Sequence, residues 1–450
     1  MTRVIRTELR RSASLVTALL MLALAAAHIG TIYDYWRASA VLAGHELATG
    51  LSLLLPLAAA CGAMVGRREI RVRAVELLES TGRPRWQRFL PSTAALGIAV
   101  AGPYLLVGSV CLVLVAAGGG MLDVAGGVLP VIAALTLTGA AWLGIAAGRA
   151  WSSPVLPPLL AAALLVVQAR PPQLTGAYDR WSNLTFTPEP APATVWETPT
   201  AAALLARLAL AAGLVIAGLL LIAGRSWLSR AGAGVVLAAG LAGLVLIAAP
   251  GPAGHWRLEP SAQRLVCADG EPEVCVTAAH AYLLPQVVPE VRRGLAALAV
   301  LPGAPTRAAE IRLHTIGDHS SEQWYRFAPY DEPGTVYFVV DYSSTEGGDP
   351  GVAARIAMGG GTYLTGCGAQ EDVPLMVAGA WLLGTGDFRV WEPGFGYWGW
   401  SDLQPEVRER LRALRELPKE EQLARVTAVR DAAARCEPDL MARLTGEVPA

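Results

Sequence analysis

Seven stretches of about 20 mostly apolar residues lie in the first 250 residues of this 450-residue chain. A helix needs about 20 such residues to cross the ~30 Å hydrocarbon core of a bilayer. Helices satisfy their own backbone N–H and C=O groups, which lipid cannot do. The chain is therefore predicted to be a multi-pass membrane helical bundle. The predicted spans are 12–33, 47–66, 92–117, 128–148, 152–169, 205–224 and 231–250.

The first and the fifth predicted spans are less regular than the others. The first is too long to be only a signal peptide, and no clear cleavage site follows it. The fifth is the least regular, because Pro154, Pro157 and Pro158 fall near its start. Proline is tolerated in a first helical turn, where the N–H groups have no intrahelical partner. We therefore predict that both segments span the membrane.

Arginine is unequally distributed between the two sides that these spans create. With a cytoplasmic N-terminus, fourteen of the 18 arginines in residues 1–250 lie on the inner side. Because Lys and Arg are enriched in cytoplasmic loops, this orientation is the predicted one. Seven spans then place residues 251–450 outside the cytoplasm. The four arginines on the outer side are Arg37, Arg170, Arg180 and Arg207.

The net charge of −1 is the sum of two opposite halves. Residues 1–250 hold 18 basic and 10 acidic residues (+8), and residues 251–450 hold 18 basic and 27 acidic ones (−9). Such asymmetry indicates that the halves face different surroundings. The single lysine, Lys419, has no glycine near it, whereas a phosphate-binding loop requires glycines and a lysine. The chain is therefore not itself a P-loop NTPase.

Residues 251–450 have the pattern of an α+β domain. Apolar runs at 262–267, 308–315 and 335–341 predict strands, and helical patterns occur at 279–300, 371–384, 405–416 and 419–447. Four of the six cysteines lie here. An even number of cysteines in an extracytoplasmic domain predicts disulfides, and four free buried thiols are the alternative. We favour the pairs Cys267–Cys275 and Cys367–Cys436.

The segment 67–91, between the second and third predicted spans, is basic and amphipathic. Residues 67–88 hold seven basic and three acidic residues, a net charge of +4. Gly82 stands where a helix C-cap belongs, and Pro84 follows as a stop signal. The apolar positions share one helical face: Ile70, Ala74, Leu77 and Leu78. This predicts a short helix at the cytoplasmic surface, which either rests on the membrane or docks a partner.

Several of these features together resemble the permease subunit of an ABC transporter of the second exporter type, in its actinobacterial form. They are the basic start RVIRTELRRS, the loop REIRVRAVELLESTGRPRWQRFL and the outer segment 170–204 before the sixth span. In that family the corresponding loop is a coupling helix that docks on a separate ATPase. The resemblance assigns the docking role to Val75, Glu76, Leu77, Leu78, Glu79, Ser80, Thr81, Gly82, Arg83 and Arg85.

The resemblance implies a six-span exporter-type core in residues 1–250, here with a seventh span and a C-terminal α+β extracytoplasmic domain in 251–450. It implies a subunit of the cell membrane that exports a small amphiphilic molecule, a lipid or a peptide. ATP and Mg²⁺ would bind the cytoplasmic ATPase, and the permease would act as a homodimer or beside a related permease. The chain itself would be no enzyme and would bind no nucleic acid. The alternative is a membrane-anchored sensor or envelope assembly protein whose outer domain binds a ligand.

Other candidate residues follow from their chemistry. Ionisable groups inside spans are functional candidates, which applies to His28 and Arg207, although snorkelling or a local hydrogen bond also explains them. An aromatic cluster would pack as a loop, rest on lipid headgroups or bind an amphiphile. Its members are Trp391, Phe395, Tyr397, Trp398 and Trp400.

A metal site is not expected. His314, Asp318 and His319 are ligand types, but the chain has no H-E-x-x-H and no C-x-x-C spacing. The G-x-S-x-G pattern of serine hydrolases is also missing. The sequence therefore predicts neither a metal nor a catalytic residue.

Overall fold

The protein is described here from a computed structural model. It describes residues 13–71, 85–168, 195–224, 226–247, 255–316, 325–327, 332, 334–338, 340, 350–358, 371–385, 403–435 and 437–447. The chain forms two compact units: Met1–Glu259 with Ile316–Tyr325, and Pro260–Thr315 with Arg326–Ala450. The first unit extends beyond residue 250 because residues 256–258 pair with a strand of that unit.

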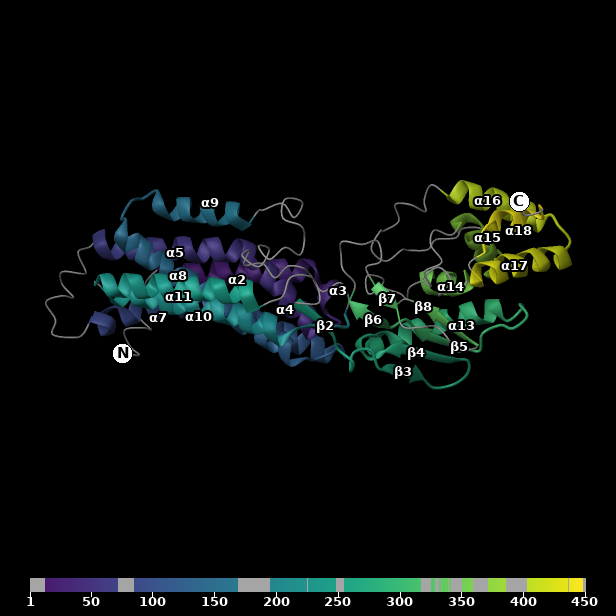
Figure 1. Ribbon diagram of the computed structural model, residues 1–450, viewed down its shortest axis with the longest axis horizontal. Helices are drawn as coiled ribbons and strands as arrows, with labels where there is room; N and C mark the ends of the chain where they lie inside the picture. The colour runs from purple at the N-terminus through teal and green to yellow at the C-terminus, as the bar shows by residue number, and fades with distance from the viewer. Residues whose placement is uncertain are drawn as a thin grey trace. The chain divides into compact units, whose positions relative to one another are not determined.

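The first unit is a bundle of apolar helices (Figure 1). Six of the described helices are long and apolar enough to cross a membrane. They are α2 (Ala13–Thr31), α5 (Leu51–Arg71), α7 (Arg85–Ala117), α8 (Val124–Ala150), α10 (Ala201–Ala223) and α11 (Trp227–Ile247). Their lengths and composition are those of a multi-pass membrane helical bundle.

The fifth predicted span, 152–169, contains a shorter helix than expected. This helix, α9, begins at Leu156, and as described it ends at Gln168, which gives 13 residues. At about 1.5 Å per residue these 13 residues extend over ~20 Å, less than the thickness of the hydrocarbon core. Among the described residues, six helices are thus long enough to span, and the helix of the fifth predicted span begins at Leu156, after Pro154.

α9 nevertheless follows α5 in the opposite direction. Arg67 Nε, near the end of α5, donates to the Ser152 carbonyl oxygen over 3.1 Å. Gln168 Nε2 donates to the carbonyl oxygen of Ser52, near the start of α5, over 3.3 Å. The segment 152–168 therefore covers most of the length of α5.

The contact between α5 and α8 brings their backbones together. Four glycines lie in it, each facing a carbonyl oxygen of the other helix: Gly62, Gly66, Gly144 and Gly148. A Cβ added at any of them would lie 2.0–2.2 Å from such an oxygen. Small residues four apart let membrane helices approach closely. The Gly144–Gly148 spacing is thus used for packing.

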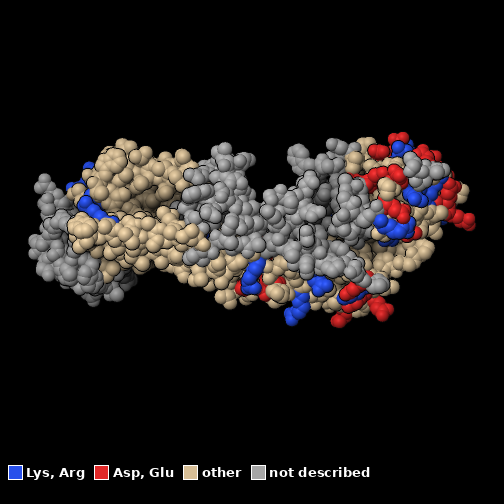
Figure 2. Space-filling view, viewed as in Figure 1, with Lys and Arg blue, Asp and Glu red and all other residues tan. Residues whose placement is uncertain are grey.

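The helix contacts define two ends of the bundle. α5, α8 and α10 run in one direction, and α2, α7, α9 and α11 run in the other. We call one end the arginine end, because arginines lie near helix termini there: Arg67, Arg68, Arg71, Arg149 and Arg230. Figure 2 shows basic side chains at this end and uncharged ones along the bundle.

The opposite end, which we call the polar end, joins elements that the sequence did not predict. They are α3 (Tyr33–Trp36), α4 (Ala40–Thr49), β1 (Glu197–Pro199) and β2 (Trp256–Leu258). β1 and β2 pair antiparallel, and Asp123 Oδ2, at the start of α8, accepts a hydrogen bond of 2.6 Å from the Thr198 hydroxyl. The chain leaves the bundle at Glu259, which follows β2 at this end.

The second unit contains an α+β fold. A sheet of order β3-β4-β5-β8 is antiparallel between β3 and β4 and parallel between the other neighbours. Its strands are β3 (Leu265–Ala268), β4 (Glu273–Thr277), β5 (Arg307–Glu310) and β8 (Thr335–Phe338). A separate two-stranded sheet contains β6 (Leu313–Ile316) and β7 (Tyr325–Phe327).

Helices pack with this sheet around one apolar core. They are η3 (Ala278–Leu283), α13 (Leu284–Leu298), α14 (Pro350–Ala357), α15 (Asp372–Leu382), α16 (Gln404–Arg415), α17 (Lys419–Ala434) and α18 (Leu440–Thr445). The predicted helix 419–447 is thus two helices. Asp439, with φ 63°, takes the left-handed conformation between them and follows Pro438.

The close contact between α5 and α8 predicts that an added side-chain carbon at its glycines lowers the stability of the protein. Gly144→Ala should destabilise the protein by about 1–3 kcal/mol, because the new Cβ would lie 2.1 Å from the Ala59 oxygen. Gly127→Ala, in the same helix, is the control, because its Cβ would have nothing within 4 Å. Alanine favours helix over glycine by up to about 1 kcal/mol, so the control should be neutral or stabilising. Thermal unfolding of the purified proteins in detergent measures both, and equal effects would refute the packing role.

Candidate functional site

Most of the site residues predicted from sequence lie outside the described residues. This applies to 75–83 in the coupling loop, to the aromatic cluster 391–400, and to Cys367 and Cys436. Arg85 is described as the first residue of α7. Asp318 and His319 are also outside, and of His314 only its place in β6 is described.

The arginine end borders the predicted coupling loop. α5 ends there with three arginines, and α7 begins there at Arg85. The guanidinium of Arg149, at the end of α8, lies 4.0 Å from the centre of the Phe89 ring of α7, in cation–π geometry. The residues that lead into and out of the loop are therefore anchored on the same end of the bundle.

His28 has local partners at the polar end. Its Nε2 lies 3.0 Å from Thr49 Oγ1 and 3.0 Å from the Glu46 carbonyl oxygen. This joins the end of α2 to the end of α4. Of the explanations considered for His28, the structure contains the local hydrogen bond.

Arg207 lies on the interior face of α10. Its neighbours one helical turn away on that face are buried: Ala203, Leu210 and Ala211. Its Nη1 is buried and has no hydrogen-bond partner. Isolated charges in a protein interior are costly, and arginine does not lose its proton in proteins. Within the part of the chain that the structure describes, Arg207 is therefore a positive charge without an ion-pair partner near the polar end.

His45 lies in α4, and its exposed fraction is 1%. Its ring makes an edge contact with the Trp256 ring, with centroids 5.7 Å apart, and its Nδ1 has no hydrogen-bond partner. Burial, and then the charge of Arg207, lower the pKa of His45 to about 3. The imidazole is thus neutral at physiological pH.

His255 shares this environment. Its carbonyl oxygen accepts a hydrogen bond from the backbone N–H of Thr200, whose hydroxyl caps the start of α10. Burial, and then the charge of Arg207, lower the pKa of His255 to about 4. Three separate segments meet at the polar end, because Leu204 of α10 packs against the apolar cluster of Val41 and Trp256, and the Trp256 ring contacts His45. One cation and two neutral imidazoles therefore lie at the same end of the bundle: Arg207, His45 and His255. We call these three residues the Arg–His cluster.

The second unit confirms one predicted disulfide, Cys267–Cys275. The two residues face each other in the antiparallel pair of β3 and β4. Glu273 lies close enough to both sulfurs for the three to hold a metal. The disulfide uses both sulfurs, so they are not available as thiolate ligands.

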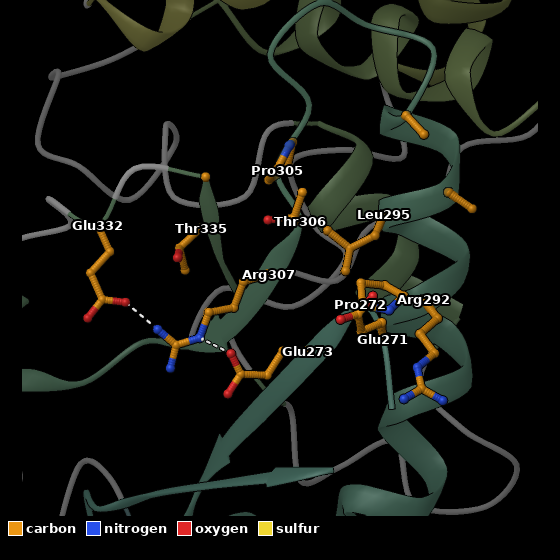
Figure 3. Close-up of a pocket in the computed structure, with 13 residues that line it drawn as sticks. Glu271, Pro272, Glu273, Arg292, Leu295, Pro305, Thr306, Arg307, Glu332 and Thr335 are labelled. Carbon is orange, nitrogen blue, oxygen red and sulfur yellow. Dashed lines mark hydrogen bonds and ion pairs between the residues drawn. The ribbon is translucent and has the colours of Figure 1, made fainter. Parts of the chain in front are cut away.

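A groove with a volume of about 890 Å³ lies beside the starts of β4, β5 and β8 (Figure 3). Arg307 extends between two carboxylates: Nε lies 2.9 Å from Glu273 Oε2, and Nη1 pairs with Glu332. Arg292, also in the lining, donates to the Asp269 carbonyl oxygen over 2.7 Å. Both arginines of the groove are thus already engaged.

A buried hydrogen-bond group fixes the sheet to η3. Glu310 Oε2 accepts from the backbone N–H (2.6 Å) and the hydroxyl (2.8 Å) of Thr277. Its other oxygen lies 2.5 Å from His280 Nδ1. Three partners satisfy this buried carboxylate, and its role is to hold β5 against the segment that follows β4.

The chain has no match in three comparisons with known proteins. No protein-family profile matches it, no curated protein matches it and no solved structure matches it. Only the sequence and the structure of this chain therefore bear on its function.

The two lowered histidine pKa values predict a pH effect. The unfolded chain binds protons at these histidines more readily, so acidification below pH ~6.5 favours unfolding, by up to about 1.4 kcal/mol per pH unit and histidine. Thermal unfolding in detergent between pH 4.5 and 7.5 should show this loss. The double variant His45→Gln and His255→Gln should reduce it.

Glu46→Gln is the control for the sign of this effect. Burial raises the pKa of Glu46, while His28 and Thr49 act in the opposite direction. Its raised pKa favours the folded state on acidification, so removing it should leave the loss of stability in place. An unchanged acid response in the double histidine variant would contradict the burial of neutral imidazoles.

Proposed function

We propose that the chain is the permease subunit of a membrane transporter driven by a separate cytoplasmic ATPase, as in ABC exporters of the second type. The observation that carries the proposal is the arginine end, where α5 ends and α7 begins beside the basic loop 67–91. A loop held between two long helices can transmit a partner's movement to the bundle. The resemblance of its sequence to coupling helices supports that use.

The single lysine supports the need for a partner. Lys419 has no phosphate-binding loop around it, so the chain would draw on ATP hydrolysis elsewhere. The several long apolar helices favour a transport pathway over a simple membrane anchor, which requires only one or two. An exporter of a small amphiphilic molecule, a lipid or a peptide fits these properties.

We also propose the orientation of the chain. The arginine end faces the cytoplasm, following the positive-inside rule. Segment 152–168 returns the chain along α5, so that it counts as a crossing and the number of crossings is odd. The chain then leaves the bundle on the extracytoplasmic side, where the Cys267–Cys275 disulfide is chemically favoured.

Isolation of the ATPase partner tests the function. The full chain, affinity-purified from its native membrane, should carry an ATPase with a phosphate-binding loop. The triple variant Leu77→Asp, Arg83→Glu and Arg85→Glu should lose this partner, because it replaces an apolar contact and reverses two charges of the predicted docking helix.

Arg264→Glu is the matched control, since it reverses an exposed arginine of the second unit. It should retain the ATPase. Retention by the triple variant, or no ATPase with the wild-type chain, would refute the coupling role.

Reporter fusions test the orientation. Alkaline phosphatase fused after Ala450 should be active and green fluorescent protein at that position dark, because the first folds outside the cytoplasm and the second inside. A fusion of green fluorescent protein at the N-terminus is the control and should fluoresce. Fluorescence of the C-terminal fusion would overturn the odd number of crossings.

A further inference from the structure

We propose that the Arg–His cluster binds the oxyanion of a ligand, a carboxylate or phosphate group, at the polar end of the bundle. The oxyanion belongs either to a free small molecule or to the head group of an anionic amphiphile. If the ligand is the transported cargo, the proposal rests on the proposed function. The proposal that the cluster binds an oxyanion rests on the cluster alone.

The charge of Arg207 has no counterpart among the described residues. Arg207 is on the interior face of α10, and its buried Nη1 has no partner. The guanidinium makes no ion pair among the described residues, and the nearby helix cap Asp123 is engaged by Thr198 and the Ala125 N–H. Ionisable residues inside membrane helices are commonly functional. An anionic ligand would supply the charge that the cluster lacks.

The donor groups of the cluster match an oxyanion in their geometry. A guanidinium offers a planar set of N–H groups that matches the oxygens of carboxylate and phosphate. Each neutral imidazole adds one N–H donor without adding charge. His45 Nδ1 is buried and has no hydrogen-bond partner, so it is able to serve as such a donor. The Trp256 ring packs against His45 and fixes its position.

The cluster joins three segments that are distant in the sequence. His45 comes from α4, Arg207 from α10 and His255 from the residue before β2. Leu204 of α10, one turn before Arg207, packs against the apolar cluster that contains Val41 of α4 and Trp256, the neighbour of His255. This packing brings the three segments to the same end of the bundle. The β1–β2 pairing and the bond from the Thr200 N–H to the His255 oxygen fix this arrangement. The described groove of the second unit has its arginines engaged and does not offer this chemistry.

Thermal unfolding of the full chain in neutral detergent tests the site. The probes are inorganic phosphate and dihexanoyl phosphatidylglycerol, with zwitterionic dihexanoyl phosphatidylcholine as the comparison. At several times its dissociation constant, a bound probe should raise Tm by about 2–4 °C. A shift with inorganic phosphate identifies a site for free oxyanions, and a shift with phosphatidylglycerol alone identifies a head-group site. Both results support the proposal.

Variants assign the binding to the cluster. Arg207→Gln should abolish the shift, Arg207→Lys should retain part of it, and His255→Leu should weaken the apparent affinity about tenfold. Arg230→Gln, an exposed arginine at the arginine end, is the control and should respond like the wild type. If Arg207→Gln does not fold, the lysine and leucine variants decide the question.

Three results would overturn the proposal. They are no shift of the wild type with either anionic probe, an equal shift with phosphatidylcholine, or a wild-type shift in all the cluster variants. The assay needs no ATPase. Binding through Arg207 without a co-purifying ATPase would therefore leave the site in place and refute only the proposed function.

Discussion

The arrangement of the bundle depends on a contact between two backbones, those of α5 and α8. Glycines on both helices face carbonyl oxygens of the other, so the contact leaves no room for even one added carbon atom. α8 also contacts α4, α7 and α10. Fixing α8 against α5 therefore fixes the helices that bring His45 and Arg207 to the same end. The Arg–His cluster depends on packing at residues that have no chemistry of their own.

Close packing also determines the electrostatics of the polar end. A tightly packed apolar interior excludes water, so a charge inside it is poorly screened and acts over a longer range than on a surface. The buried histidines respond by remaining neutral, because protonation would add charge beside Arg207. The cluster therefore carries one positive charge rather than three, and this suits a singly charged ligand group.

Sequence reasoning identified the features that depend on long repeated patterns. Apolar runs identified the six long helices, and cysteine spacing identified Cys267–Cys275. It missed α4 and β4, which are short and buried, because a few buried residues in succession have no period. The site was missed in part for the same reason. Arg207 stood out as a charge within an apolar run, whereas His45 and His255 lie in short segments that only the fold brings together.

Arg207 also differs physically from the other arginines of the first unit. Arg68, Arg71 and Arg230 are exposed near helix termini at the arginine end, and such residues are the ones on which the positive-inside rule acts. Arg207 faces the bundle interior, so the positive-inside rule does not account for its position. Without Arg207, three arginines rather than four lie on the outer side, against fourteen on the inner side. Arg207 is thus the outer arginine that fits the predicted orientation least, and its buried position is explained by a bound anionic ligand.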